Sequence, residues 1–136
     1  MAMEQKHIRI GYFDNLKGEG SILISADIDG LLELEDTFLK LSQGLTAFNF
    51  SKLKLLDKSH KIKLVAIIDM ENIGLIPTIK GTFEWKVRPE KWGEYREKLT
   101  ALYRNSNSGH QYLDSNSIDN KDLQVIFSFN EYPLSF

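Results

Sequence analysis

The hydrophobic pattern of this chain changes its period along the sequence, and that change constrains the fold more than any other feature. In some segments apolar and polar residues alternate, which is the pattern of half-buried β-strands. In two others apolar residues recur every three or four positions, as they do on one face of an α-helix. The predicted strands cover residues 7–13, 21–28, 46–53, 61–70, 79–87 and 123–129.

Two helices are predicted between these strands. We expect Asp27 to end the second strand and Asp29 to cap the first helix, because an aspartate side chain accepts hydrogen bonds from the free N–H groups of a first turn. Gly44 fits the position just past that helix, where the backbone often takes a positive φ. Pro89 fits the first turn of the second helix. The apolar faces consist of Leu31, Leu34, Phe38 and Leu41 in the first helix, and of Trp92, Tyr95, Leu99, Leu102 and Tyr103 in the second.

This order of elements predicts an α+β fold. Strands joined by short turns favour antiparallel pairing, and amphipathic helices can cover one face of such a sheet. We therefore expect a mostly antiparallel sheet of about six strands with two amphipathic helices packed on one face. The length of 136 residues suits a single domain that spans residues 1–136. The sequence leaves the strand order and the oligomeric state open.

The composition excludes several classes of protein. Hydrophobic residues make up 42% and charged residues 26% of the chain, which argues against intrinsic disorder. Because the chain contains no cysteine, disulfides, thiolate metal sites and cysteine nucleophiles are excluded. The N-terminal residues lack the apolar core of a secretory signal, and no segment is apolar enough to span a membrane. These features predict a cytoplasmic protein that does not associate with a membrane.

The small net charge of -2 hides an uneven distribution. Residues 1–50 contain eight acidic and four basic side chains, residues 51–106 contain seven and twelve, and residues 107–136 contain four and one. Separate acidic and basic patches would steer a charged partner, unless the fold mixes these segments in space. The densest basic cluster lacks the arginines and interleaved aromatics typical of nucleic-acid binding, so we expect no nucleic-acid partner. This cluster consists of Lys52, Lys54, Lys58, Lys61 and Lys63.

No motif of an enzyme active site occurs in the sequence. His7, His60 and His110 are too far apart to form a metal site that sequence spacing reveals. Neither a phosphate-binding glycine loop nor a nucleophile elbow is present. We therefore expect no catalytic residues, no metal and no cofactor. For His110, a structural role and a functional role both stay open.

The C-terminal third contains two short motifs. An aromatic-rich helix leads through a polar loop to GHQYLD at residues 109–114, a hydrophobic strand follows, and NEYP occupies residues 130–133. Over residues 84–133 this pattern resembles small immunity proteins of bacterial polymorphic-toxin systems. Such proteins are encoded beside a toxin that they bind and neutralise. The resemblance implies a cytoplasmic, non-enzymatic binder of a cognate toxin domain, without identifying the toxin.

Three functions are compatible with these features. The first is a toxin-neutralising binding protein, in which aromatic anchors give affinity and a charged rim steers the partner. The second is a structural or regulatory interaction module with another partner, and the third, less favoured, is an enzyme that acts on a small ligand. We expect the partner-binding residues on the first helix and near the C-terminus. These candidates are Glu33, Glu35, Asp36, Tyr112, Asp114, Glu131 and Tyr132.

Overall fold

A computed structural model gives the fold of the protein. It describes residues 7–16, 19–57, 62–71, 73–79, 81–105, 108–116 and 123–130. The elements identified within these ranges are two α-helices, one short 3-10 helix and eight strands, and the strands form two four-stranded sheets.

The first sheet combines strands that are far apart in the sequence. It consists of β1 (Ile8–Leu16), β2 (Glu19–Ala26), β8 (Leu123–Phe129) and β7 (Gly109–Asn116), in that spatial order. β1 and β2 form an antiparallel hairpin, whereas β2 and β8 run parallel, and β8 and β7 run antiparallel. These strands contribute a set of apolar residues to the core, among them Ile8, Ile10, Ile22, Ile24, Val125 and Phe127.

The second sheet is formed by the chain between the two helices. It consists of β3 (Ala47–Asn49), β4 (Lys63–Ile68), β6 (Thr82–Val87) and β5 (Gly74–Pro77), in that spatial order. β4 and β6 run parallel, and the two outer strands pair antiparallel with them. Phe83, Trp85 and Val87 of β6 are buried while the residues between them are half-buried, which confirms the predicted alternation.

The α+β class is confirmed, but the prediction of one mostly antiparallel sheet of about six strands is wrong, because the strands form two mixed sheets. β5 and β7 are additional strands. β5 is short and bounded by Gly74 and Pro77, and β7 is a polar segment whose composition favours a loop. The parallel pairs join residues far apart in the sequence, which hydrophobic periodicity does not reveal. The predicted strand 46–53 ends at Asn49, where the 3-10 helix η1 (Phe50–Lys52) begins.

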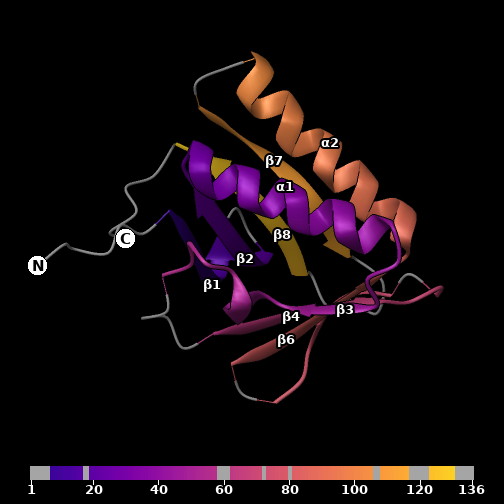
Figure 1. Ribbon diagram of the computed structural model, residues 1–136. Helices are drawn as coiled ribbons and strands as arrows, with labels where there is room; N and C mark the ends of the chain where they lie inside the picture. Colours follow the sequence, from indigo (N-terminus) through magenta and orange to yellow (C-terminus); the bar gives the residue numbers. More distant parts are fainter. Residues whose placement is uncertain are drawn as a thin grey trace, which may run out of the picture.

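The helices α1 (Ile28–Ser42) and α2 (Pro89–Asn105) pack against each other and against the first sheet. Figure 1 shows them side by side across that sheet, with the second sheet below them. Neither helix, within the part of the chain that the structure describes, is long and apolar enough to span a membrane. The predicted apolar stripes are confirmed by burial of Leu31, Leu34, Phe38 and Leu41 in α1, and of Trp92, Tyr95, Leu99 and Leu102 in α2.

The start of α1 differs from the prediction in two details. The predicted strand 21–28 ends at Ala26, and Ile28 is already the first residue of α1. Asp27, not Asp29, is the N-cap, and its Oδ1 accepts a hydrogen bond of 3.0 Å from the N–H of Gly30. Asp29 lies in the first turn instead, where its negative charge suits the positive end of the helix dipole. At the other end, Gly44 follows the C-cap with a φ of 125°, as predicted.

An aromatic cluster joins both helices to the second sheet. The ring of Trp85 in β6 lies 4.7 Å from that of Trp92 and 5.1 Å from that of Tyr95, both in α2. Phe38 of α1 packs 5.4 Å from Trp92. All four side chains are fully buried or nearly so. Because aromatic pairs of this kind add to the energy of apolar burial, the inward side of α1 is held firmly.

Candidate functional site

The outward face of α1 carries a row of exposed residues spaced four apart. We call Ile28, Leu32, Asp36 and Lys40 the outer row. Ile28 is 40% and Leu32 45% exposed, so each presents part of a large aliphatic side chain to the solvent. Asp36 and Lys40 form an exposed ion pair of 3.0 Å. The outer row therefore places two apolar side chains next to two charged ones in the solvent.

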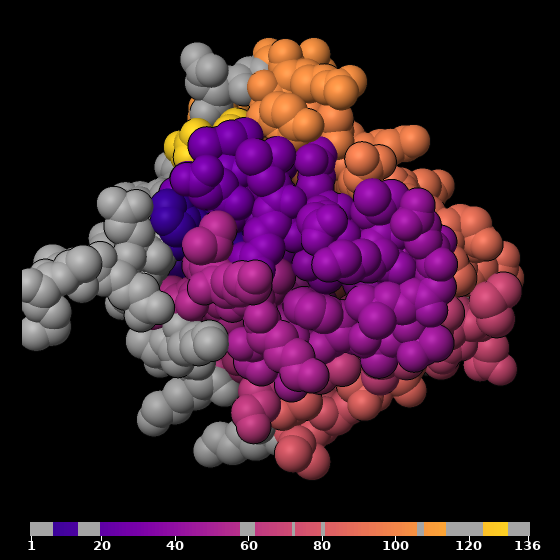
Figure 2. Space-filling model, viewed as in Figure 1, coloured from indigo at the N-terminus to yellow at the C-terminus, as the bar shows by residue number. Residues whose placement is uncertain are grey.

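A hollow lies beside the outer row, between α1 and residues 48–55, which include η1 and which we call the η1 segment. In the space-filling view, α1 and this segment occupy the same face of the molecule (Figure 2). The hollow has a volume of about 430 Å³. We call it the α1–η1 hollow, and its lining residues are Glu33, Asp36, Thr37, Lys40, Phe48, Lys52, Lys54 and Leu55. Glu33 and Asp36, from the acidic segment 1–50, thus lie close to Lys52 and Lys54, from the basic segment 51–106. At this place the fold brings acidic and basic side chains of the two segments together.

Glu33 holds the wall of the α1–η1 hollow in place. Its Oε2 accepts a hydrogen bond of 2.7 Å from the N–H of Lys54, and its Oε1 accepts one of 2.9 Å from the N–H of Leu55. These two bonds link α1 to a segment more than 20 residues further along the chain. Both carboxylate oxygens are therefore engaged within the protein.

Glu35 lies between the two helices rather than on the surface. Its side chain accepts a hydrogen bond from the hydroxyl of Thr100 in α2, and the residue is 9% exposed. A buried carboxylate without such a donor would be costly. Glu35 therefore stabilises the contact between α1 and α2. Of the three predicted acidic residues of α1, Asp36 alone projects freely from the surface, with its side chain 61% exposed.

The remaining candidates lie on or beyond β7. Tyr112 is 40% exposed, packs edge-on against His110 at 5.8 Å, and accepts a hydrogen bond on its carbonyl from Lys98 of α2. The backbone of Asp114 pairs with Val125, but its side chain lies outside the described residues. Glu131 and Tyr132 lie entirely outside them. The structure therefore brings Glu33 and Asp36 together around one hollow and places Tyr112 on a different element.

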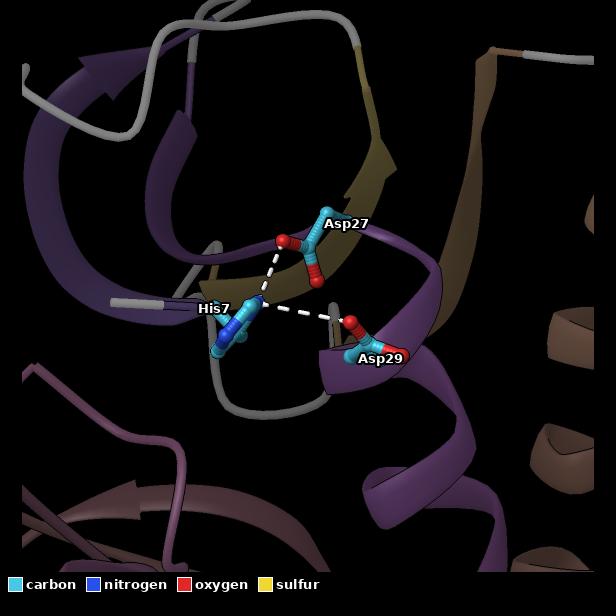
Figure 3. A group of neighbouring side chains, drawn as sticks. All are labelled: His7, Asp27 and Asp29. Atoms are coloured by element: carbon cyan, nitrogen blue, oxygen red, sulfur yellow. Dashed lines mark hydrogen bonds and ion pairs between the residues drawn. The ribbon is translucent and has the colours of Figure 1, made fainter. Parts of the chain in front are cut away.

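His7, Asp27 and Asp29 form the one group of metal-type ligands found among the described residues. Figure 3 shows the imidazole of His7 directed toward both carboxylates. Its Nδ1 lies 2.5 Å from Oδ2 of Asp27 and 3.9 Å from Oδ2 of Asp29. These atoms could serve as ligands for Zn²⁺ or Mn²⁺. The His7 pairing was not visible in the sequence, because His7 lies 20 residues before Asp27.

Three features of this group favour a structural role. Asp27 already uses Oδ1 to cap α1 and Oδ2 to pair with His7. The group also lies at the N-terminus of α1, where the positive end of the helix dipole opposes a cation. In addition, the carbonyl of His7 accepts a hydrogen bond from the N–H of Asp27. We therefore assign these residues to the junction between β1 and α1 rather than to a metal site.

Sequence reasoning missed Ile28 and Leu32, although one signal was available. Leu32 is a large aliphatic residue out of phase with the stripe that runs from Leu31 to Leu41, whereas Ile28 falls in the predicted strand 21–28 and lies three residues before Leu31. An apolar residue on the polar side of a helix can offer a surface to a partner.

Comparison with known proteins gives no relative. No protein-family model, no curated protein and no solved structure matches this chain.

Proposed function

We propose that the protein is a non-catalytic cytoplasmic binding protein, and more specifically an immunity protein that neutralises a cognate bacterial toxin by direct binding. The observation that carries this proposal is the outer row. Ile28 and Leu32 are exposed side by side on α1, in line with the Asp36–Lys40 ion pair. Apolar residues surrounded by charged ones are the usual arrangement of a protein-binding surface.

The outer row also meets the energetic needs of a binding site. Binding energy concentrates in a few apolar anchors on preorganised elements, because flexible anchors lose entropy on association. The inward face of α1 is buried against the aromatic cluster, so the helix presents Ile28 and Leu32 from a fixed position. Asp36 and Lys40 then supply the charged rim that orients a partner.

The predicted partner-binding residues fall into three groups. Asp36 contacts the toxin directly, and Tyr112 adds an exposed aromatic side chain on β7. Glu33 and Glu35 act indirectly, since their carboxylates hold the η1 segment and α2 against α1. Asp114, Glu131 and Tyr132 stay candidate contacts, because their side chains lie outside the described residues.

The test is co-expression with the C-terminal domain of the protein encoded by the adjacent gene. We expect that domain to arrest growth, the wild-type protein to restore it, and the two to copurify. Leu32→Asp should weaken the complex at least about tenfold, because it replaces an apolar anchor with a charge. The matched control is Ile79→Asp, which changes a residue 77% exposed in the turn between β5 and β6.

The outcomes separate the alternatives. If the wild-type protein neither protects the cells nor binds the domain, the immunity function is wrong. If protection occurs but Leu32→Asp and Ile79→Asp behave alike, the toxin binds elsewhere and the outer row is not the site. Thermal unfolding of both variants shows whether a loss of binding reflects a loss of folding.

A further inference from the structure

The α1–η1 hollow has unbalanced charges once its internal contacts are taken into account. Glu33 accepts two backbone hydrogen bonds, and Asp36 pairs with Lys40. Lys52 and Lys54 are exposed, and no ion pair of their ammonium groups occurs among the described residues. Hydrogen bonds from neutral N–H groups leave the charge of Glu33 in place, so the lining side chains sum to a charge of +1, with the ammonium groups of Lys52 and Lys54 available to a partner.

The floor of the hollow is apolar and fixed. Phe48 and Leu55 are half-buried, so each presents part of its side chain to the hollow. Phe48 packs edge-on against Phe50 at 5.7 Å, and Phe50 is itself buried in the core. A partner side chain that entered the hollow would bury apolar surface against Phe48 and Leu55. Because Phe48 is already packed against Phe50, little of its conformational entropy would be lost on binding.

These two features restrict the chemistry of the occupant. A simple anion would use the lysines but gain nothing from Phe48. A nucleic-acid backbone carries a run of phosphates, and the hollow has only two available lysines for them, so its further phosphates would meet the carboxylates of Glu33 and Asp36. A protein segment that carries a carboxylate beside an apolar side chain satisfies both the charged wall and the apolar floor.

We infer that the α1–η1 hollow binds an acidic protein segment, with an Asp or Glu of the partner on Lys52 and Lys54 and an adjacent large apolar side chain on Phe48 and Leu55. This inference rests on the proposed function, because it names the part of the toxin surface that the protein recognises. The hollow thus adds two basic contacts to the acidic ones expected on α1, of which Glu33 is engaged within the protein and Asp36 stays exposed beside Lys40.

The first experiment follows amide chemical shifts of the full-length protein during titration with defined probes. The probes are a short peptide in which glutamates alternate with leucines, the same peptide with lysines in place of glutamates, inorganic phosphate and a DNA oligonucleotide. We expect shifts at Phe48, Lys52 and Lys54 with the acidic peptide, at concentrations of about 1 mM or below. Added salt should weaken this binding, since exposed charge pairs are screened.

Matched variants test the role of the lysines. Lys52→Glu/Lys54→Glu should weaken binding of the acidic peptide about tenfold or more, because two exposed charge pairs are lost and reversed. Lys63→Glu, at an exposed position of β4 outside the hollow, should leave binding unchanged. The inference is overturned if the lysine peptide, phosphate or DNA shifts the same residues equally, if none of the probes shifts them, or if Lys63→Glu has the same effect.

The same variants separate this inference from the proposed function. If the wild-type protein and Lys52→Glu/Lys54→Glu neutralise the toxin domain equally well, the immunity function stands and the acidic-segment inference fails. If the wild-type protein does not neutralise the toxin domain, the proposed function fails, and the peptide titration decides the chemistry of the hollow by itself.

Discussion

Residues of the same type have opposite surroundings on the two faces of α1. Leu31, Leu34 and Leu41 on the inward face are completely buried, whereas Leu32 on the outward face is 45% exposed. Burial of a leucine side chain stabilises a fold by about 1.5–3 kcal/mol, so only the inward leucines contribute this in full. An exposed leucine on a firmly held helix instead offers apolar surface for a partner to cover. The face of α1 on which a leucine lies thus decides its role. Inward leucines stabilise the fold, and we propose that Leu32 on the outward face binds a partner.

The flanks of α1 add a second lesson about charge. Glu33 and Asp36 are both acidic, lie one turn apart and line the same hollow. Glu33 binds two backbone N–H groups, whereas the side chain of Asp36 is exposed and pairs only with a neighbouring lysine in the interactions of the described chain. In a count of charges along the sequence, these two residues are equivalent. In the structure, Glu33 connects α1 to Lys54 and Leu55, whereas the exposed carboxylate of Asp36 can also contact a partner.

The largest expected effect separates the two faces of α1 directly. Phe38→Ala should lower the free energy of unfolding by about 3–5 kcal/mol, because it leaves a cavity among Trp85, Trp92 and Tyr95. Leu32→Ala should lower it by no more than about 0.5 kcal/mol, as is usual for exposed positions. Urea denaturation monitored by tryptophan fluorescence measures both. Equal losses would mean that the outward face is as important for folding as the inward face.

A pair of glycine substitutions tests how closely the inward side of α1 is packed. A Cβ at Gly30 would lie 2.3 Å from the carbonyl oxygen of His7 and 2.6 Å from Cγ1 of Ile8, so Gly30→Ala should cost about 1–3 kcal/mol. Gly93 of α2 is the matched control, since its nearest contact would be Cβ of Ser42 at 3.9 Å. Gly93→Ala should stabilise the protein by about 0.5–1 kcal/mol, because alanine favours a helix. If Gly30→Ala is tolerated equally well, α1 does not need its close approach to β1.

The smallest expected effects compare the two acidic residues. Glu33→Ala removes an acceptor shared by two backbone N–H groups and should cost about 1.5 kcal/mol. Asp36→Ala removes only an exposed ion pair and should cost about 0.3–0.5 kcal/mol. Chemical denaturation of both variants, with hydrogen exchange at the amides of Lys54 and Leu55, checks the assignment. Unchanged exchange at these amides in Glu33→Ala would contradict the role of Glu33.

Local pattern predicts the helices well and the sheets less well. The stripe from Leu31 to Leu41 is a property of neighbouring residues, so its burial follows from the sequence. The arrangement of sheets is not local, because β2 pairs with β8 across about a hundred residues. β7 also has no apolar alternation to reveal it, since Gly109–Asn116 is mostly polar. It is a strand because β8 supplies its hydrogen-bond partners.

The candidate site was predictable only in its parts. The sequence singled out Asp36 and the lysines near residue 52 separately. Their meeting in one hollow depends on the path of the chain after α1 and on the two hydrogen bonds of Glu33. Leu32 was visible as an apolar residue outside the stripe, but its exposure and that of Ile28 become meaningful only when the inward face is known to be fully packed.

The spatial order of the first sheet has a consequence for biosynthesis. A ribosome releases β1, β2 and both helices before it releases residues 123–129, yet β8 occupies a central place between β2 and β7. One edge of β2, with Ile22 and Ile24, therefore stays unpaired until nearly all of the described chain has been translated. Unpaired apolar edges are prone to wrong association. This edge is paired only once β8 has been translated and has inserted beside β2, so rapid translation would shorten the exposed interval and a chaperone could cover the edge during it.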